Sequence, residues 1–504
     1  MSSAERFGLG VALGLGVLVR LIPVLGAAGA VGDGGLIHAM VDDIRAAGMG
    51  IPATTSYNNL DIPFVYPPLA LLLGAALGET TGVSTLDLLR WLPMLLSIAG
   101  LGAFAWLAGR VLPPVAAVAA TLAYALMPHA YDWVIAGGGL TRGLGLLAAL
   151  VAMALAAGRP TDSLRAPLLA GVALGVAVLS HPQAAIVGAI GCLVLSWSAP
   201  PERWARNAAL AAAVAVALAV PWLAGVIQTH GVDDLLNPAN RFDPLVGFIR
   251  LGNLRFSGAP FMDVFAVAGV MGVLVAVVRG PRTVPLLLLL TYLFGAGGGE
   301  FLAAVPWALS AGIGAGALIK LLLDGGRPRA ARAVAAASAA VFLFLALIGS
   351  LGAVAEGSSK LHALSTGHLE ALAWLADNTD QDARVLVPTA GVWGDDEVSE
   401  WLPALGERRS IGTVQGSEWL GADGFNSQLA THNAIRDCSG STVACYAAID
   451  PGALIFIPKG QLAGPFSPGD CCPALRETVA GSGYRIAFDG RGATIAVPLS
   501  AGGH

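Results

Sequence analysis

Charged side chains are scarce in this sequence. Only 12% of its 504 residues are Asp, Glu, Lys or Arg, whereas 56% are hydrophobic. An average soluble domain contains about 25% charged residues. The formal net charge of −5 argues against a nucleic-acid partner. The sequence also lacks the Gly-x-x-x-x-Gly-Lys-[Ser/Thr] motif, so the chain is not by itself an ATP-driven pump.

Apolar runs of membrane-spanning length recur along the first two thirds of the chain. They predict a polytopic α-helical membrane protein with about 11 transmembrane helices. The first run is too long and too rich in glycine, without a small-residue cleavage site, for a removed signal peptide. The expected spans are 7–28, 90–109, 113–128, 143–157, 166–180, 184–198, 207–226, 262–278, 283–296, 301–323 and 333–355.

One more apolar segment, 67–77, decides the topology. Counting it as a span would put several arginines outside, and its length of about 11 residues is short for a span. We therefore expect an interfacial or re-entrant helix, a cytoplasmic N-terminus and an extracytoplasmic C-terminus. The arginines that then lie in the cytoplasm, as the positive-inside rule requires, are Arg6, Arg110, Arg159, Arg165, Arg203, Arg206, Arg279, Arg282, Arg327, Arg329 and Arg332.

The composition changes after residue 356. Acids, Asn, Trp and Cys appear, and no further run reaches the length of a span. Short apolar runs such as ARVLVP, ALIFIPK and ATIAVPL alternate with helical patterns. We therefore expect a membrane module over 1–356 and an extracytoplasmic α/β domain over 357–504.

Four of the five cysteines lie in this second part. Their number suggests disulfides and an oxidising compartment. Zinc is the alternative, although the spacing of Cys438 and Cys445 followed by an adjacent pair is not usual for zinc. Because a bridge between neighbours is strained, we expect Cys438 and Cys445 each to pair with Cys471 or Cys472, in either order.

The first external loop, 29–89, opens with GDGGLIHAM. Residues 34–48 show the spacing of an amphipathic helix lying in the membrane interface. Asp33 stands at the N-terminus of this helix. It either caps the helix or serves as a general base at the membrane surface.

These features together resemble the multi-span glycosyltransferases of the GT-C class. They are Arg20 near the outer end of the first span, Gly-Asp at the start of the loop, the amphipathic helix, YPPL from Tyr66, further spans and a C-terminal domain. Distant similarity extends to protein O-mannosyltransferases and aminoarabinose transferases, and the spacing of Asp33 and His38 resembles oligosaccharyltransferase catalytic subunits. Gly34 stands where many relatives carry a second acid.

The resemblance implies an inverting transfer of sugar from a polyprenyl-phosphate donor to an extracytoplasmic lipid, glycan or protein acceptor. Asp33 matches the catalytic acid and general base. Arginine and histidine suit the departing phosphate, and the glycines 137–139 leave space for an anion beside backbone amides. The candidates for phosphate binding are His38, Arg90, Arg142 and His181.

Two further side chains are candidates for substrate contact. Tyr66 either touches substrate or anchors the chain at the headgroups while the two prolines begin a helix. Glu300 either faces a cavity and contacts the acceptor or a cation, or caps the helix that follows it. The long external loop 227–261 is either a lid or a solvated loop.

The acidic stretch WGDDE offers weak candidates for a divalent cation. Asp395, Asp396 and Glu397 either bind a metal ion through oxygen ligands or form a turn that caps a helix. The surrounding order of elements is similar to the soluble domain of oligosaccharyltransferases. The second Trp and the Tyr of their peptide-reading motif are missing here, so peptide recognition is not implied.

Two other functions compete with this interpretation. One is an oligosaccharyltransferase-like protein glycosylase, and the other is a transporter or flippase of lipid-linked intermediates. A transporter places ionisable residues at the middle of its spans. Here they gather in the external segments instead, which favours chemistry at the membrane surface.

Overall fold

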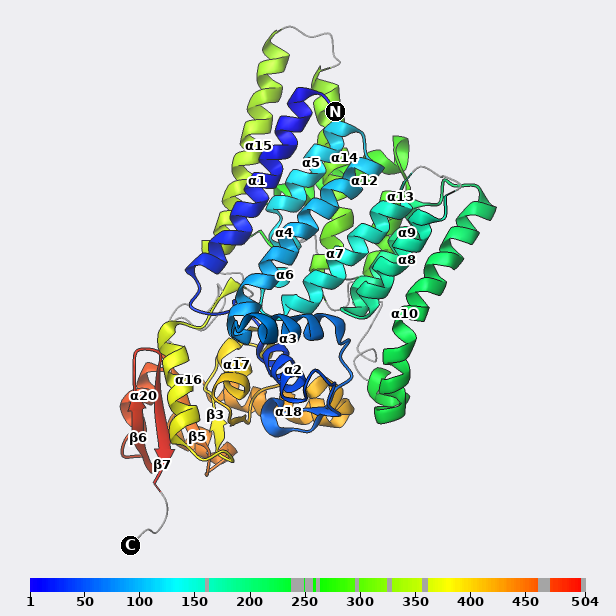
Figure 1. Cartoon of the computed structure of the whole chain (residues 1–504). Helices are drawn as coiled ribbons and strands as arrows, with labels where there is room; N and C mark the ends of the chain where they lie inside the picture. Colours follow the sequence, from blue (N-terminus) through cyan, green and yellow to red (C-terminus); the bar gives the residue numbers. More distant parts are fainter. Residues whose placement is uncertain are drawn as a thin grey trace.

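A bundle of apolar helices and a C-terminal α/β domain make up the protein, with the N-terminus at the end of the bundle away from that domain (Figure 1). The structure is a computed structural model. It describes residues 1–158, 163–236, 249, 257–259, 263–294, 299–323, 329–355, 361–460 and 472–499.

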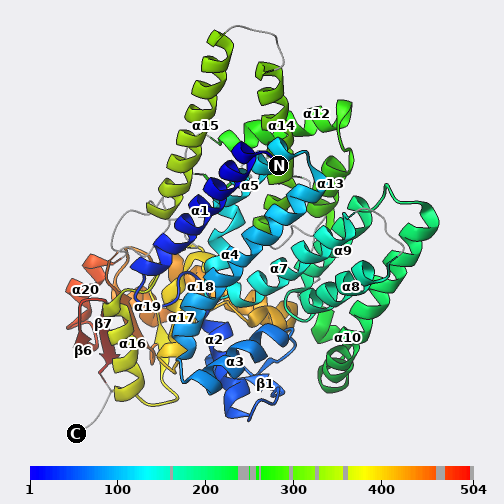
Figure 2. The same ribbon diagram turned by 45° about the horizontal axis from the view of Figure 1, so that its top comes forward.

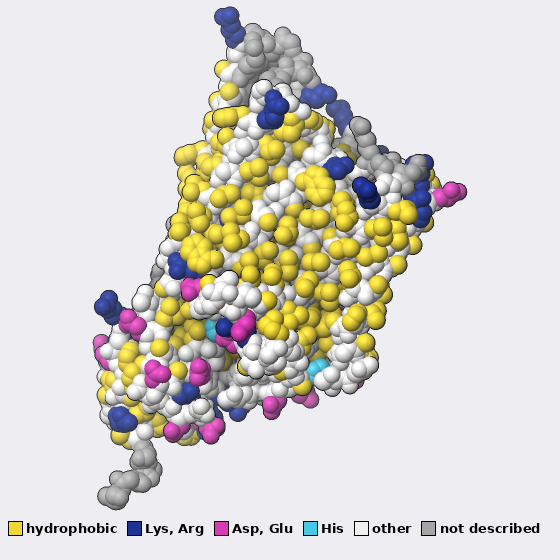
Figure 3. Space-filling view, in the orientation of Figure 1, with side chains coloured by type: hydrophobic (Ala, Val, Ile, Leu, Met, Phe, Trp, Pro, Cys, Tyr) yellow, Lys and Arg dark blue, Asp and Glu magenta, His cyan; other side chains and the backbone are white. Residues whose placement is uncertain are grey.

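The helices of the bundle confirm the polytopic α-helical fold. By length and composition, six helices of the described part can cross a membrane, and six shorter helices are also apolar. Along the bundle run α1 (Ser3–Gly26), α4 (Thr85–Val111), α5 (Pro114–Leu126), α7 (Gly139–Ala156), α8 (Arg165–Val178), α9 (Pro182–Leu195), α10 (Pro201–Leu236), α12 (Val264–Arg279), α13 (Thr283–Phe294), α14 (Glu300–Leu323) and α15 (Arg329–Ala355). On the face in Figure 3 their surface is largely hydrophobic, and most Asp and Glu gather toward the C-terminal domain.

Small residues bring the bundle helices close together. A Cβ on Gly272 of α12 would collide with the carbonyl oxygen of Ser310 on α14. A Cβ on Gly312, also on α14, would collide with the carbonyl oxygen of Ala116 on α5. Close backbone approach is the usual basis of helix packing in membranes, where lipid removes the hydrophobic drive between helices.

Two helices of the first loop lie at the end of the bundle beside the C-terminal domain (Figures 1 and 2). They are α2 (Gly35–Ala46) and α3 (Leu69–Thr81), and α3 lies across the bundle end in Figure 1. The apolar side chains of α2, among them Met40, Val41 and Ile44, are buried. The expected amphipathic helix is present, and apolar residues of α3 and of the C-terminal domain cover its apolar face.

The C-terminal domain contains a five-stranded mixed sheet of order β4-β3-β5-β7-β6. Its strands β3 (Arg384–Leu386), β4 (Arg409–Ser410) and β5 (Leu454–Pro458) are parallel, and β7 (Ala493–Pro498) pairs antiparallel with β5 and with β6 (Tyr484–Asp489). The helices are α16 (Thr366–Asn378), α17 (Glu397–Leu405), α18 (Gly421–Asp437), α19 (Val443–Ile449) and α20 (Pro473–Val479), with short turns η6 (Trp393–Asp395) and η7 (Ser417–Trp419). The expected α/β class is confirmed.

Alternation along the strands divides the apolar residues between two cores. Phe456 belongs to one core, and its neighbours Ile455 and Ile457 belong to the other. Successive side chains of a strand point to opposite faces of the sheet, so the two cores lie on opposite faces. We call them the first-loop core and the disulfide core.

The first-loop core joins the loop between α1 and α4 to the C-terminal domain. Beside α2 and α3 it contains Tyr57, Ile62 and Phe64, from the segment with β1 (Thr54–Thr55), η1 (Tyr57–Asn59) and β2 (Ile62–Pro63). The side chain of Asn58 donates to the carbonyl of Ser410 at 2.9 Å and accepts from its amide at 2.7 Å. The loop and the domain therefore pack as one unit.

The disulfide core contains the bridge that gives it its name. Cys438, at the end of α18, pairs with Cys445 of α19, seven residues away, with 5.8 Å between their Cα atoms. The expectation that each pairs with Cys471 or Cys472 is wrong, because the turn between α18 and α19 brings the first two together. Cys472 is also disulfide-bonded, and Cys471 lies outside the described residues.

Candidate functional site

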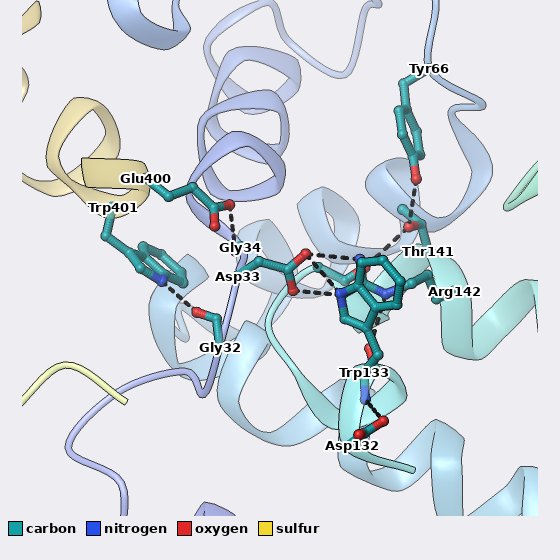
Figure 4. Close-up of polar contacts among 11 residues, drawn as sticks. Gly32, Asp33, Gly34, Tyr66, Asp132, Trp133, Thr141, Arg142, Glu400 and Trp401 are labelled. Atoms are coloured by element: carbon teal, nitrogen blue, oxygen red, sulfur yellow. Dashed lines mark hydrogen bonds and ion pairs between the residues drawn. The ribbon is translucent and has the colours of Figure 1, made fainter. Parts of the chain in front are cut away.

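An ion pair between Asp33 and Arg142 forms the centre of the site (Figure 4). Arg142 Nη2 lies 2.5 Å from Asp33 Oδ1, and Nη1 lies 2.9 Å from Oδ2. The indole N–H of Trp133 donates to Asp33 Oδ2 at 3.3 Å. The side chains of Asp33 and Arg142 are 17% and 11% exposed, so the pair is shielded yet reachable from solvent.

Arg142 is itself held by the segment before its helix. Its Nε donates to the carbonyl of Trp133 at 2.9 Å, and its guanidinium lies 4.9 Å from the centre of the Trp133 ring. These bonds use three of the five N–H groups of a guanidinium. Two N–H groups therefore remain for an anion.

The glycines 137–139 let the chain fold tightly around the pair. The amides of Gly137 and Gly138 donate to the carbonyls of Val31 and Asp33, each at 2.7 Å, and the Gly139 amide donates to Ala136. The expectation that these amides approach an anion is therefore wrong. The glycines allow close contact instead, since a Cβ on Gly138 would stand 3.0–3.1 Å from the Arg142 and Asp33 side chains.

Arg20 supports the same segment from inside the bundle. It is fully buried, donates to Ser97 Oγ at 3.0 Å and to the carbonyls of Gly16 and Ala125, each at 2.9 Å. Its guanidinium also lies 5.0 Å from the ring centre of Tyr131, two residues before Trp133. The arginine thus ties the end of α5 to the chain that positions the indole.

Tyr66 and His181 approach the pair from two other elements. The Tyr66 hydroxyl lies 3.0 Å from Thr141 Oγ1, next to Arg142 (Figure 4). His181 stands in the turn before α9 and accepts the Ala184 amide through Nδ1 at 3.3 Å. Burial, followed by the charge of Arg142, lowers the pKa of His181, which favours the neutral imidazole.

Glu300 begins α14 and pairs with a histidine. His129 Nε2 lies 2.9 Å from Glu300 Oε2. The next residue, Phe301, contacts both site aromatics edge to face, with ring centres 5.7 Å from His181 and 6.3 Å from Trp133. Glu300 thus lies close to the Asp33–Arg142 pair. Its neighbour Phe301 packs on Trp133 and His181, which lie beside that pair.

His129, Asp132, Trp133 and Thr141 belong to the site but were missed from the sequence. Asp132 is buried and accepts the amide of Trp133 at 2.6 Å through Oδ1. Three of the four fall within the stretch HAYDW, between two spans and close before Arg142. This concentration of polar and aromatic residues in a short segment between two apolar helices was the available signal.

His38 and Arg90 make other contacts. His38 Nδ1 lies 3.3 Å from Asp42 Oδ2, one helical turn on, and its ring meets Trp401 edge to face with centres 6.0 Å apart. Burial lowers the pKa of His38 against the effect of Asp42. Arg90 donates through Nε and Nη2 to the carbonyl of Val24, each at 3.1 Å. It therefore supplies hydrogen-bond donors to a carbonyl in the last turn of α1.

The acids of WGDDE do not fit a metal site. Asp396 is buried and caps α17, accepting from the amide of Ser399 at 3.2 Å and from its hydroxyl at 2.7 Å. Asp395 ends η6 and Glu397 begins α17. Among the described residues, no group of three or more His, Cys, Asp or Glu side chains is placed to hold a metal ion. Most of the loop 227–261 lies outside the described residues.

Comparison with solved structures identifies the fold. The oligosaccharyltransferase of Archaeoglobus fulgidus matches with a TM-score of 0.61 and 13% identity, over 90% of this chain and 69% of that one. ArnT from Cupriavidus metallidurans, bound to undecaprenyl phosphate, matches with a TM-score of 0.58 and 14% identity over 99% of both chains. The mycobacterial arabinofuranosyltransferase AftD matches with a TM-score of 0.52 and 17% identity, over 99% of this chain and 40% of that one.

Sequence comparison adds no closer relative. No protein-family model matches the sequence, and no curated protein matches it. The structural matches are nevertheless long and agree with one another, covering both the bundle and the C-terminal domain. The chain therefore has the fold of the polytopic GT-C glycosyltransferases.

Proposed function

We propose that the protein is an inverting glycosyltransferase that moves a sugar from a polyprenyl-phosphate carrier to an extracytoplasmic acceptor. The observation that carries the proposal is the Asp33–Arg142 ion pair, set where the apolar bundle meets the first loop and the C-terminal domain. A carboxylate and a cation in contact at a membrane surface suit proton removal and phosphate binding in one reaction.

The residues divide the reaction between them. The acceptor hydroxyl attacks the anomeric carbon, Asp33 takes its proton, and the bond from that carbon to the phosphate oxygen breaks. Arg142 holds the Asp33 carboxylate in place and offers its two remaining N–H groups to the phosphate as charge develops there. Neutral His181 lies beside Arg142 as a second phosphate contact, and Glu300 with His129 faces the acceptor.

The nature of the donor is supported by two relatives of the same fold. ArnT was solved with undecaprenyl phosphate, and the archaeal oligosaccharyltransferase AglB with dolichol-phosphate. Both ligands are polyprenyl phosphates, which need a polar headgroup site joined to an apolar path for the chain.

An apolar cavity of about 320 Å³ between α8, α9 and α10 meets the second requirement. Small and aliphatic side chains such as Leu174, Ala189 and Ala215 line it. Val178 and Ala185, also in its lining, flank the turn that carries His181. We assign this cavity to the first isoprene units of the donor.

Substitution of Asp33 tests the proposal. The purified chain is given a labelled polyprenyl-phosphate sugar with membrane lipid, glycan or peptide acceptors in separate assays. Asp33→Asn keeps the shape of the side chain but is a far weaker base, so we expect a loss of at least about 10²-fold in transfer. Asp61→Asn, an exposed first-loop acid, is the matched control. Undiminished transfer by Asp33→Asn would refute the assignment.

A further inference from the structure

The peptide that carries Asp33 is held on both sides by one helix of the C-terminal domain. Glu400 Oε1 of α17 accepts the amide N–H of Gly34 at 2.9 Å. The indole N–H of the next residue, Trp401, donates to the carbonyl of Gly32 at 2.8 Å (Figure 4). The two bonds therefore fix the peptide planes before and after the aspartate.

The contact is tight as well as polar. A Cβ on Gly34 would stand 2.8 Å from the Trp401 ring, and a Cβ on Gly35 would collide with the carbonyl oxygen of Glu400. Glu400 is 9% exposed and Trp401 is 1% exposed. Glycine at positions 34 and 35 is thus what lets α17 approach the loop.

The position of α17 is fixed in turn by its surroundings. Asp396 caps its first turn. The Tyr57 hydroxyl, from the first loop, donates to the carbonyl of Glu400 at 2.6 Å, and Thr413 donates to the carbonyl of Ser399 at 2.5 Å. The helix is therefore a rigid support, not a freely moving cover.

We propose that Glu400 and Trp401 are positioning residues for Asp33, and that Glu400 acts through its acceptor oxygen and not through its charge. The inference rests on the proposed function, since it gives Asp33 the role of base. A shift of about 1 Å in a reacting group costs about 10²-fold in rate. Without the two bonds, the carboxylate loses its fixed distance to Arg142 and to the acceptor.

Paired variants at Glu400 test the inference. Glu400→Gln keeps an acceptor oxygen, and Glu400→Ala removes it. We expect Glu400→Ala to lower kcat by about 10–100-fold with little change in the donor KM, and Glu400→Gln to stay within about threefold of wild type. Trp401→Phe, which keeps the ring but loses the N–H, is expected to lower kcat by about tenfold. Glu370→Ala, an exposed acid on α16, is the control.

Hydrogen exchange at the Gly34 amide gives a readout that does not depend on activity. We expect faster exchange in Glu400→Ala and wild-type protection in Glu400→Gln. Unchanged kcat and exchange in Glu400→Ala would overturn the inference, as would a low kcat in Glu400→Gln with the amide still protected. A wild-type chain that transfers no sugar, but shows the stated exchange pattern, refutes the proposed function and supports the positioning contact.

Discussion

At the residue scale, Arg142 is bound through geometry that lysine cannot reproduce. Its guanidinium meets both oxygens of Asp33 and the carbonyl of Trp133 at once. An ammonium group carries the same charge but has no planar fork. Arg142→Lys is therefore expected to lose about 1.5–3 kcal/mol of transition-state stabilisation, or about 10–150-fold in kcat/KM, measured in the transfer assay.

The control for this variant is Arg110→Lys, at the end of α4, where the side chain is exposed. Its guanidinium also lies over an aromatic ring, 5.6 Å from the centre of the Trp106 ring. It has no role in the proposed reaction. Wild-type kcat/KM is expected for Arg110→Lys. Wild-type kcat/KM in Arg142→Lys would mean that charge alone suffices.

Sequence reasoning reached Asp33 and Arg142, and Tyr66, His181 and Glu300 near them, but missed other residues that hold the pair in place. Asp33 and Arg142 stand out because ionisable side chains are rare in an apolar chain and costly near lipid. Trp133 was missed because an aromatic residue at a membrane interface is ordinary. Glu400 lies more than 360 residues from its partner Gly34, and no local pattern reports a contact of that separation.

At the scale of elements, the N-terminus of α16 depends on a neutral histidine. His368 Nδ1 accepts the amide of Ser365 at 3.2 Å, and Ser365 Oγ accepts the amide of His368 at 3.2 Å, which completes a capping box. Only a neutral imidazole has a lone pair for this bond. Burial lowers the pKa of His368, partly opposed by a bond to the backbone of Lys459.

This capping box predicts how stability depends on pH. The unfolded histidine, with a pKa of about 6.5, binds its proton more readily than the folded one. The contribution to stability is thus complete above pH of about 6.5 and is lost as pH falls toward the lowered folded pKa, by at most about 1.4 kcal/mol per pH unit. Unfolding in detergent, followed by Trp fluorescence between pH 5 and 8 (about 0.5-unit steps), measures it.

The variant His368→Gln isolates this effect. Glutamine serves as the third residue of a capping box without titrating, so the pH dependence should become shallower. His38 and His362, whose pKa values burial also lowers, keep their contributions. His230→Gln, in α10, is the control for replacing a histidine with glutamine. An unaltered slope in His368→Gln would contradict the assignment.

The spans and strands were largely predictable, and their partners were not. Apolar runs gave the bundle helices because span length follows from bilayer thickness. The pattern of α2 predicted the helix but not its neighbours, since an apolar stripe does not reveal whether lipid or protein covers it. The predicted cysteine pairing was wrong because the bridge depends on the turn between α18 and α19. The positions of the cysteines in the sequence do not reveal that turn.

At the scale of the whole molecule, the two faces of the sheet have different neighbours. The first-loop core joins the sheet to the segment that carries Asp33, and the disulfide core lies on the opposite face. Substitutions on the two faces that lower the folding stability by similar amounts should therefore affect sugar transfer differently.

Two variants with comparable stability costs make the comparison. Replacing Cys438 and Cys445 by serine opens a short loop, with an expected loss of about 2–3 kcal/mol. Ile62→Ala empties a fully buried site in the first-loop core, at a cost of about 2–5 kcal/mol. Both should lower the unfolding midpoint in detergent.

The rate of sugar transfer, measured under conditions where both variants are still folded, should distinguish the two variants. Because Ile62 lies on β2 within the unit that holds Asp33, Ile62→Ala should lower kcat by about tenfold through displacement of the base. The double cysteine variant should keep wild-type kcat, since no first-loop residue belongs to the disulfide core within the described residues. Equal loss of kcat in both variants would show that the whole domain, not one face of its sheet, positions Asp33.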